Sequence, residues 1–217
     1  MRDVGTQRRP INARNTKWAV AIAALLAKKG VKPNHISVLS ILFACLAGGC
    51  LLFSSHSSIS RPVLFFLSAV FIQCRLLCNL FDGMVAIEGG FKTKSGAIYN
   101  DLPDRIADPL ILISAGYAVT GFESGVLFGW LAGLLSVMTA YIRFLGAASG
   151  ATEYFVGPMA KQHRMAVITA ALIGAMFAER WAYHEHILFG ALILVCAGCV
   201  ITIARRTVKI IRELETE

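Results

Sequence analysis

Charged residues are scarce in this sequence. Only 16% of its 217 residues are Asp, Glu, Lys or Arg, whereas an ordinary soluble domain carries about 25%. Apolar residues make up 56% of the chain. This balance excludes a soluble enzyme and a disordered chain. The apolar residues gather in stretches long enough to cross a bilayer as helices, which takes about 20 residues each. We therefore expect one all-α, polytopic membrane domain.

The sequence also lacks the features of a disulfide scaffold. All six cysteines lie inside apolar stretches. Cys196 and Cys199 form a C-x-x-C pair, but no histidine or basic residue stands nearby to activate a thiol. We interpret the cysteines as small apolar packing residues.

Six transmembrane helices are expected, preceded by an amphipathic helix that lies in the membrane interface. The apolar run from Trp18 to Ala27 is too short to span, and basic residues flank it, which is typical of an interfacial helix. We divide the chain into a cytoplasmic basic arm with this helix (1–35), a membrane domain (36–204) and a cytoplasmic tail (205–217). The expected spans are 36–54, 62–81, 105–122, 125–148, 164–178 and 187–204.

The net charge of +8 is explained by membrane topology. If the N-terminus is inside, 17 Lys and Arg residues lie in inner segments, and only Arg61 and Arg180 lie in outer loops. Basic residues accumulate on the cytoplasmic side of membrane proteins. We therefore expect both termini in the cytoplasm, a location in the cytoplasmic (inner) membrane, and no nucleic-acid partner.

The acidic residues cluster at the cytoplasmic ends of two expected spans. Asp82 ends the second span, and Asp101, Asp104 and Asp108 begin the third. On helices, Asn79 would share a face with Asp82, and Asn100 would share one with Asp104 and Asp108. Oxygen ligands without His or Cys favour a hard cation such as Mg²⁺ or Mn²⁺. Helix capping by Asp101 and Asp104 is the plainer alternative, but it leaves Asn79 and Asp82 unexplained.

A spaced motif runs through the same region. Asp82-Gly83-x-x-Ala86 is followed by Gly96 and then by Asp104, and this spacing resembles the CDP-alcohol phosphotransferase signature D-x-x-D-G-x-x-A-R-x8-G-x3-D-x3-D. The small residues alone would equally suit close helix packing. The sequence departs from the signature at three positions, where Asn79, Ile87 and Asn100 replace Asp, Arg and Asp. An uncharged Asn still offers a ligand oxygen, but with lower expected affinity.

The resemblance implies a six-helix homodimeric transferase of phospholipid synthesis. A CDP-linked lipid, typically CDP-diacylglycerol, would bind near Asp82, Gly83, Ala86 and Gly96, and transfer to an alcohol acceptor would release CMP. Asp104 matches the last motif Asp and is the expected general base. The metal candidates are Asn79, Asp82, Asn100, Asp101, Asp104 and Asp108. The candidates for contact with acceptor or donor phosphates are Arg143, Lys161 and Arg164.

Two other functions remain open at this point. Asn79 and Asn100 are consistent with a catalytically weakened protein that binds the CDP-lipid. A small cation transporter is less well supported, because it would need carboxylates near the bilayer centre rather than at its boundary. The sequence does not identify the acceptor alcohol.

Overall fold

The computed structural model describes residues 16–90 and 95–216, and these residues form helices without any strand. The predicted basic arm up to residue 15 lies outside the described residues. The elements are α1 (Lys17–Lys28), α2 (Pro33–Phe53), α3 (Arg61–Glu88), α4 (Gly96–Tyr117), α5 (Gly125–Ala148), α6 (Lys161–Ala178), the 3₁₀ turn η2 (Glu179–Trp181) and α7 (His184–Thr216).

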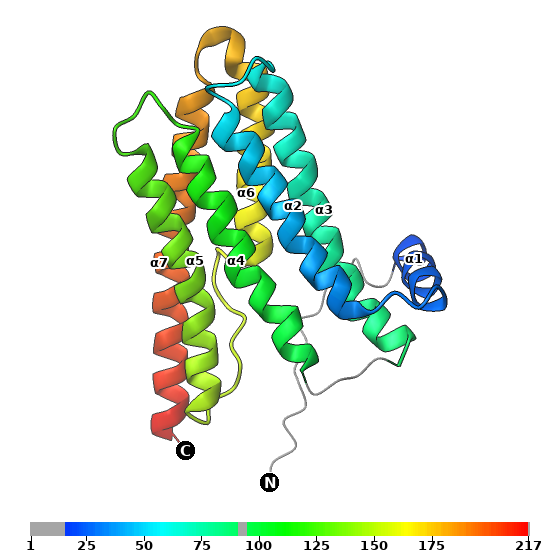
Figure 1. Cartoon of the computed structure of the whole chain (residues 1–217). Coiled ribbons are helices and arrows are strands. Elements are labelled where there is room, and N and C mark those ends of the chain that lie inside the picture. The colour runs from blue at the N-terminus through cyan, green and yellow to red at the C-terminus, as the bar shows by residue number, and fades with distance from the viewer. Residues whose placement is uncertain (1–15, 91–94, 217) are drawn as a thin grey trace.

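The helices α2 to α7 lie side by side in one bundle, and α1 lies apart from it against the end of α3 (Figure 1). α2 packs against both α3 and α4, which touch each other only sparsely. α5 packs between α4 and α7, and α6 packs between α3 and α7. The all-α prediction is therefore confirmed for the described residues.

Apolar side chains fill the centre of this bundle and also cover its outside. Leu51, Ile72 and Leu192 are completely buried and belong to one core shared by the long helices. Leu127 and Leu134 on α5 are each 65% exposed. Single exposed apolar residues are normal on soluble proteins, but large continuous apolar surfaces are not. The outer surface is therefore suited to lipid.

Glycines allow α4 and α5 to approach closely. A Cβ added to Gly116 would lie 2.7 Å from the Cα of Gly129, and one added to Gly129 would lie 2.8 Å from the Cα of Gly116. Small residues at such crossings let helix backbones pack tightly within a membrane. This contact fixes α4, which carries most of the acidic residues.

Four helices, α2, α3, α5 and α7, are long and apolar enough to cross a membrane by length and composition. The other two predicted spans correspond to α4 and α6. α4 does not meet this criterion because its first half carries charged residues. α6 does not meet it because it begins with a polar turn that contains Lys161 and Arg164. The segment predicted as a tail after residue 204 continues α7 as helix to Thr216.

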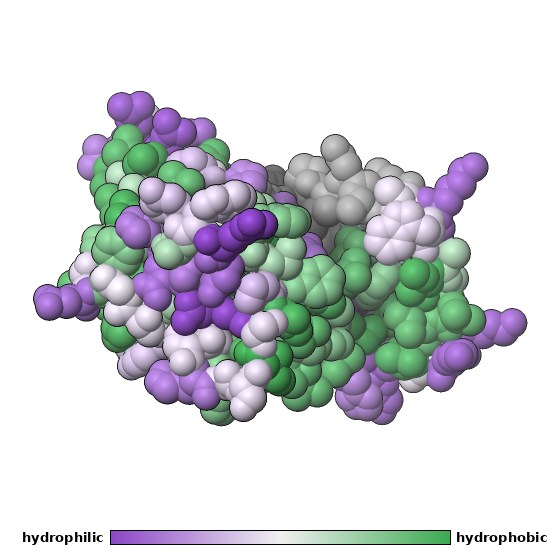
Figure 2. All heavy atoms as spheres, turned by 90° about the horizontal axis from the view of Figure 1, so that it is seen from above, coloured by the Kyte–Doolittle hydropathy of each residue, from purple (hydrophilic) through white to green (hydrophobic). Residues whose placement is uncertain are grey.

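The end of the bundle opposite the C-terminus carries a polar cluster. Figure 2 looks onto this end, where hydrophilic side chains gather over the helix connections and apolar side chains surround them. Arg61 pairs with Glu179 at 3.5 Å, and His184 lies 3.0 Å from the same carboxylate. These contacts join the start of α3 to the α6–α7 connection, away from the motif residues.

Candidate active site

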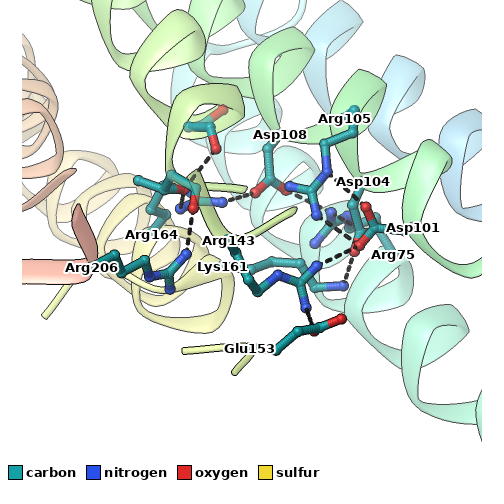
Figure 3. Close-up of polar contacts among 12 residues, drawn as sticks. Arg75, Asp101, Asp104, Arg105, Asp108, Arg143, Glu153, Lys161, Arg164 and Arg206 are labelled. Atoms are coloured by element: carbon teal, nitrogen blue, oxygen red, sulfur yellow. Dashed lines mark hydrogen bonds and ion pairs between the residues drawn. The ribbon is translucent and has the colours of Figure 1, made fainter. Parts of the chain in front are cut away.

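Arg75 joins two carboxylates of α4 to α3. Its Nη2 atom donates to Asp104 Oδ1 at 2.8 Å and to Asp108 Oδ1 at 2.6 Å (Figure 3). The Arg75 side chain is completely buried, and the side chains of Asp104 and Asp108 are 6% and 1% exposed. Isolated buried charges are costly, so each of these groups depends on its partners.

α6 supplies two further cations to the same carboxylates. Arg164 donates to Asp108 Oδ2 at 2.7 Å and also to the Met159 carbonyl at 2.9 Å. Lys161 contacts Asp104 Oδ2. Arg164 is 2% exposed, whereas the Lys161 side chain is 26% exposed. Lys161 is therefore the cation of this group that a bound molecule can reach most easily.

The α5–α6 connection places Lys161 by folding back onto α7. Gly157 has φ of +118°, and a Cβ there would lie 2.5 Å from Thr202 Cγ2. The backbone N–H of Met159 donates to Thr202 Oγ1 at 3.0 Å. Arg206 donates from Nε to the Val156 carbonyl at 2.9 Å, and its Nη1 contacts the Thr139 carbonyl. These contacts fix the connection that ends where α6 begins.

Asp82 lies buried at the end of α3 and faces α2. Its Oδ2 accepts a hydrogen bond from Ser37 Oγ at 2.7 Å, and its Oδ1 accepts one from the Gly83 N–H at 2.6 Å. One turn earlier, Asn79 donates from Nδ2 to the Arg75 carbonyl at 3.0 Å. The Oδ1 of Asn79 is buried and has no hydrogen-bond partner among the residues that the structure describes. A neutral oxygen donor thus stands next to a buried carboxylate.

Asp101 belongs to a separate, more exposed network. It pairs with Arg105 on its own helix at 2.8 Å and with Arg143 of α5 at 3.1 Å. Arg143 also contacts Glu153 at 3.2 Å and lies over the rings of Phe144 and Phe155. The Asp101 carboxylate thus faces two arginines, and it helps to hold Arg143 at the rim of the site.

The other predicted site residues differ in how deeply they are buried. Asn100 is exposed, although Asp104 and Asp108 on the same helix are buried. Gly83, Ala86 and Gly96 are half-buried. Because the positive charge of Lys161 and the negative charge of Asp104 both act on Asp82, these three side chains share one electrostatic environment.

The oxygen donors present suit one hard divalent cation that is bound by few protein ligands. They do not form a site made of several carboxylates. No group of three or more His, Cys, Asp and Glu residues in the described part of the chain lies close enough to hold a metal. Asn79 Oδ1, Asp82 and Asp104 still offer three oxygen donors, of which the amide oxygen has no hydrogen-bond partner within residues 16–90 and 95–216. Mg²⁺ commonly binds through one or two carboxylates and completes its shell with water and substrate phosphates. The residues present fit that mode.

Sequence reasoning did not assign a role to Arg75 and missed Ser37 and Arg206. The position of each arginine along its helix indicates that its side chain faces the bundle interior. Arg75 follows Ile72 at the spacing of a buried stripe, and Arg206 lies four residues after buried Thr202. A charge in phase with a buried stripe should face the bundle interior. No comparable signal distinguishes Ser37 from other serines.

Fold and site together describe a helical membrane protein whose buried carboxylates and cations could act on a phosphate group. The chain belongs to the CDP-alcohol phosphatidyltransferase family, whose family model matches residues 31–206. This confirms the resemblance based on the spaced motif. Members are membrane transferases of phospholipid synthesis that depend on divalent metal ions.

Individual relatives are distant but cover most of the chain. The inner membrane protein YnbA of Escherichia coli is 24% identical over 164 residues, covering 76% of this chain and 78% of YnbA. Phosphatidylinositol phosphate synthase of Streptomyces avermitilis is 25% identical over 207 residues, covering 91% of this chain and 80% of the relative.

Solved structures of Mycobacterium tuberculosis phosphatidylinositol phosphate synthase share the fold. The structure with CDP-DAG bound has a TM-score of 0.71 at 21% identity, covering 90% of this chain and 94% of the other. The structure with manganese and citrate has a TM-score of 0.71 at 22% identity, covering 88% of each chain.

Proposed function

We propose that this protein transfers a phosphatidyl group from a CDP-diacylglycerol-type donor to an alcohol acceptor and releases CMP. The observation that carries the proposal is Asp104, a buried motif carboxylate that Arg75 and Lys161 hold at the same end of the bundle as Asp82. The relatives support this choice, since one is a phosphatidylinositol phosphate synthase and a solved neighbour contains CDP-DAG.

The donor head group would bind at the ends of α3 and α4. Gly83, Ala86 and Gly96 are half-buried and carry little side-chain bulk, so a nucleotide could approach the backbone closely there. Lys161 and Arg143 are only partly buried, and each can contact phosphate oxygens. Arg164 is engaged with Asp108 and Thr139, which suits a positioning role more than contact with substrate.

A divalent ion, Mg²⁺ or Mn²⁺, would be held by Asn79, Asp82 and Asp104. When bound, it would polarise the phosphoryl group and stabilise the negative charge of the leaving CMP. The neighbour solved with manganese supports the choice of metal class. Asn100, Asp101 and Asp108 remain weaker ligand candidates. Asn100 is exposed, and Asp101 belongs to the outer network. Both partners of Asp108 are buried arginines, whereas one partner of Asp104 is the partly exposed Lys161.

Asp104 would act as the general base. The acceptor hydroxyl gives its proton to the Asp104 carboxylate while its oxygen forms a bond to the phosphorus that bears the lipid. The bond from this phosphorus to the bridging oxygen breaks, and the electron pair leaves with CMP. Arg75 holds one oxygen of Asp104 and so orients the carboxylate toward the acceptor.

The protein would lie in the inner membrane with six spans, α2 to α7 without η2, and with α1 in the interface. The name of the Escherichia coli relative supports this location. α1 and the end of α7 lie at the same end of the bundle, as an even number of passes requires (Figure 1). Reporter fusions after residue 217 and within 54–60 would test the topology. We also expect a homodimer, which the mass of the protein–detergent particle would test.

The decisive experiment measures CMP release from CDP-diacylglycerol. Purified protein would receive Mg²⁺ or Mn²⁺ and a panel of free and phosphorylated alcohols. We expect CMP release that depends on one class of acceptor and that Asp104→Asn lowers by about 10²–10⁴-fold. Asp101→Asn is the matched control, because it removes a nearby carboxylate from the outer network.

The outcomes separate the proposal from its alternative. An equal loss in Asp101→Asn would mean that Asp104 has no special role. Donor binding without CMP release for any acceptor would instead support a CDP-lipid-binding protein. In that case restoring aspartate at positions 79 and 100 would be the next step.

A further inference from the structure

A basic groove lies between α7 and the α5–α6 connection, outside the proposed active site. It has a volume of about 570 Å³ and is lined by Val156, Gly157, Ala204, Arg205, Val208, Lys209 and Arg212. The three cations lie at positions i, i+4 and i+7 of α7 and so share one helix face. Val156, Ala204 and Val208 supply an apolar wall beside them.

The positive charge of the groove has no counter-charge within its lining. None of the residues that line it is acidic. The guanidinium groups of Arg205 and Arg212 make no hydrogen bond or ion pair within the described residues, and Lys209 lies 5.5 Å from the centre of the Tyr154 ring. The nearby Glu213 does not line the groove, and it accepts hydrogen bonds from the Thr152 N–H at 3.0 and 3.1 Å. These three cations are therefore available to an anion from outside the chain.

The groove lies at the depth of lipid head groups. α7 has 33 residues, which at about 1.5 Å per residue gives a length of about 50 Å, well beyond the roughly 30 Å of a hydrocarbon core. Its apolar part ends where Arg205 begins, so Arg205 to Arg212 follow directly on the membrane-spanning part. Basic residues at this position attract anionic lipids.

We propose that this groove binds one anionic phospholipid. Its head-group phosphate would contact Arg205, Lys209 and Arg212, and an acyl chain would lie along Val156, Ala204 and Val208. Guanidinium and ammonium groups both bind phosphate oxygens, and the apolar wall gives a reason for a lipid rather than free phosphate. The site is distinct from the catalytic centre, because none of the residues that line it is a hydrogen-bond or ion-pair partner of the Asp82, Asp104 or Asp108 side chain in the described part of the chain.

Native mass spectrometry of the full chain in detergent tests the proposal. The probes are phosphatidylglycerol and phosphatidylcholine with matched acyl chains. We expect one tightly bound phosphatidylglycerol and only weak phosphatidylcholine binding. The triple variant Arg205→Gln, Lys209→Gln, Arg212→Gln should bind phosphatidylglycerol about a hundredfold more weakly.

The matched control is Lys17→Gln, Lys28→Gln, Lys29→Gln, which removes three exposed charges from α1 near the same end of the bundle. We expect it to bind phosphatidylglycerol as the parent does. A thermal shift on addition of phosphatidylglycerol, present in the parent and control but lost in the groove variant, gives a second readout on folded protein.

Three results would overturn the proposal. They are unchanged phosphatidylglycerol binding by the groove variant, displacement of the lipid by millimolar inorganic phosphate, and a groove variant that differs from the parent in the number of subunits. None of these measurements depends on CMP release, so the groove and the proposed reaction can fail separately.

Discussion

Replacing Arg75 by methionine should lower both stability and activity. The variant removes the group that joins Asp104 and Asp108 to α3 and leaves a shorter, uncharged side chain. Both carboxylates stay buried, and neither gains a new partner from the substitution. The structure therefore predicts a loss of stability through unbalanced charge and a loss of activity through a poorly oriented Asp104.

The size of the effect follows from the partners that remain. Removing one member of a buried ion pair costs about 3–5 kcal/mol. Arg164 still contacts Asp108 and Lys161 still contacts Asp104, so we expect a loss near the lower limit, about 3 kcal/mol. For a chain of this length that corresponds to a fall in Tm of about 6–12 °C. Misorientation of a catalytic group by about 1 Å can cost about a hundredfold in rate.

Thermal unfolding in detergent and CMP release at a temperature where the variant is folded would measure the two effects. We expect kcat to fall about a hundredfold while KM for the donor changes little, because Arg75 does not face the donor site. Arg75→Lys should restore part of the activity, since an ammonium can contact one carboxylate. Arg105→Met is the control, because it breaks a partly exposed pair with Asp101 worth about 0.3–0.5 kcal/mol. A parent-like Tm and kcat in Arg75→Met would refute the reasoning.

Three further predictions follow from single contacts. Asn79→Asp should tighten Mn²⁺ binding by about tenfold, because it adds charge where Oδ1 has no hydrogen-bond partner in the described part of the chain. Equal affinity in an EPR titration would argue against Asn79 as a ligand. Gly157→Ala should cost about 1–3 kcal/mol, because φ is +118° and the Cβ would meet Thr202, and an unchanged unfolding curve would contradict this. Ser37→Ala should cost about 1.5–3 kcal/mol through the lost hydrogen bond to Asp82, which thermal unfolding would detect.

The extent of each helix was predictable only where the apolar pattern is strong. The run at 125–148 coincides with α5, because apolar residues fill it from end to end. α3 instead continues seven residues past the predicted 62–81, and α4 begins nine residues before the predicted 105–122. Backbone hydrogen bonds continue a helix beyond the hydrocarbon, where the side chains become polar. Except for Asn79, the motif residues from Asp82 to Asp104 lie on these polar extensions, outside the spans that a hydropathy pattern predicts.

The sequence could not predict which charged residues contact each other, for a different reason. Arg75 and Asp108 are 33 residues apart, and their contact depends on how α3 and α4 are rotated about α2. Helical phase could indicate that each faces inward, but it could not identify the partner. The spaced motif, by contrast, predicts one site for Asp82 and Asp104 without any knowledge of packing, because the family signature that it resembles contains both positions.

Of the two motif asparagines, half-buried Asn79 fits the charge balance of the buried centre, whereas Asn100 is exposed. Asp82, Asp104 and Asp108 carry three negative charges, and Arg75, Lys161 and Arg164 carry three positive ones. Aspartate at position 79 would add a fourth negative charge one turn from Arg75, beside a cluster that is already neutral. Uncompensated charge is expensive in such surroundings. The chain thus keeps oxygen donors at these positions while side-chain cations balance its carboxylates, and a bound divalent ion would find its own counter-charge in the phosphates of the donor.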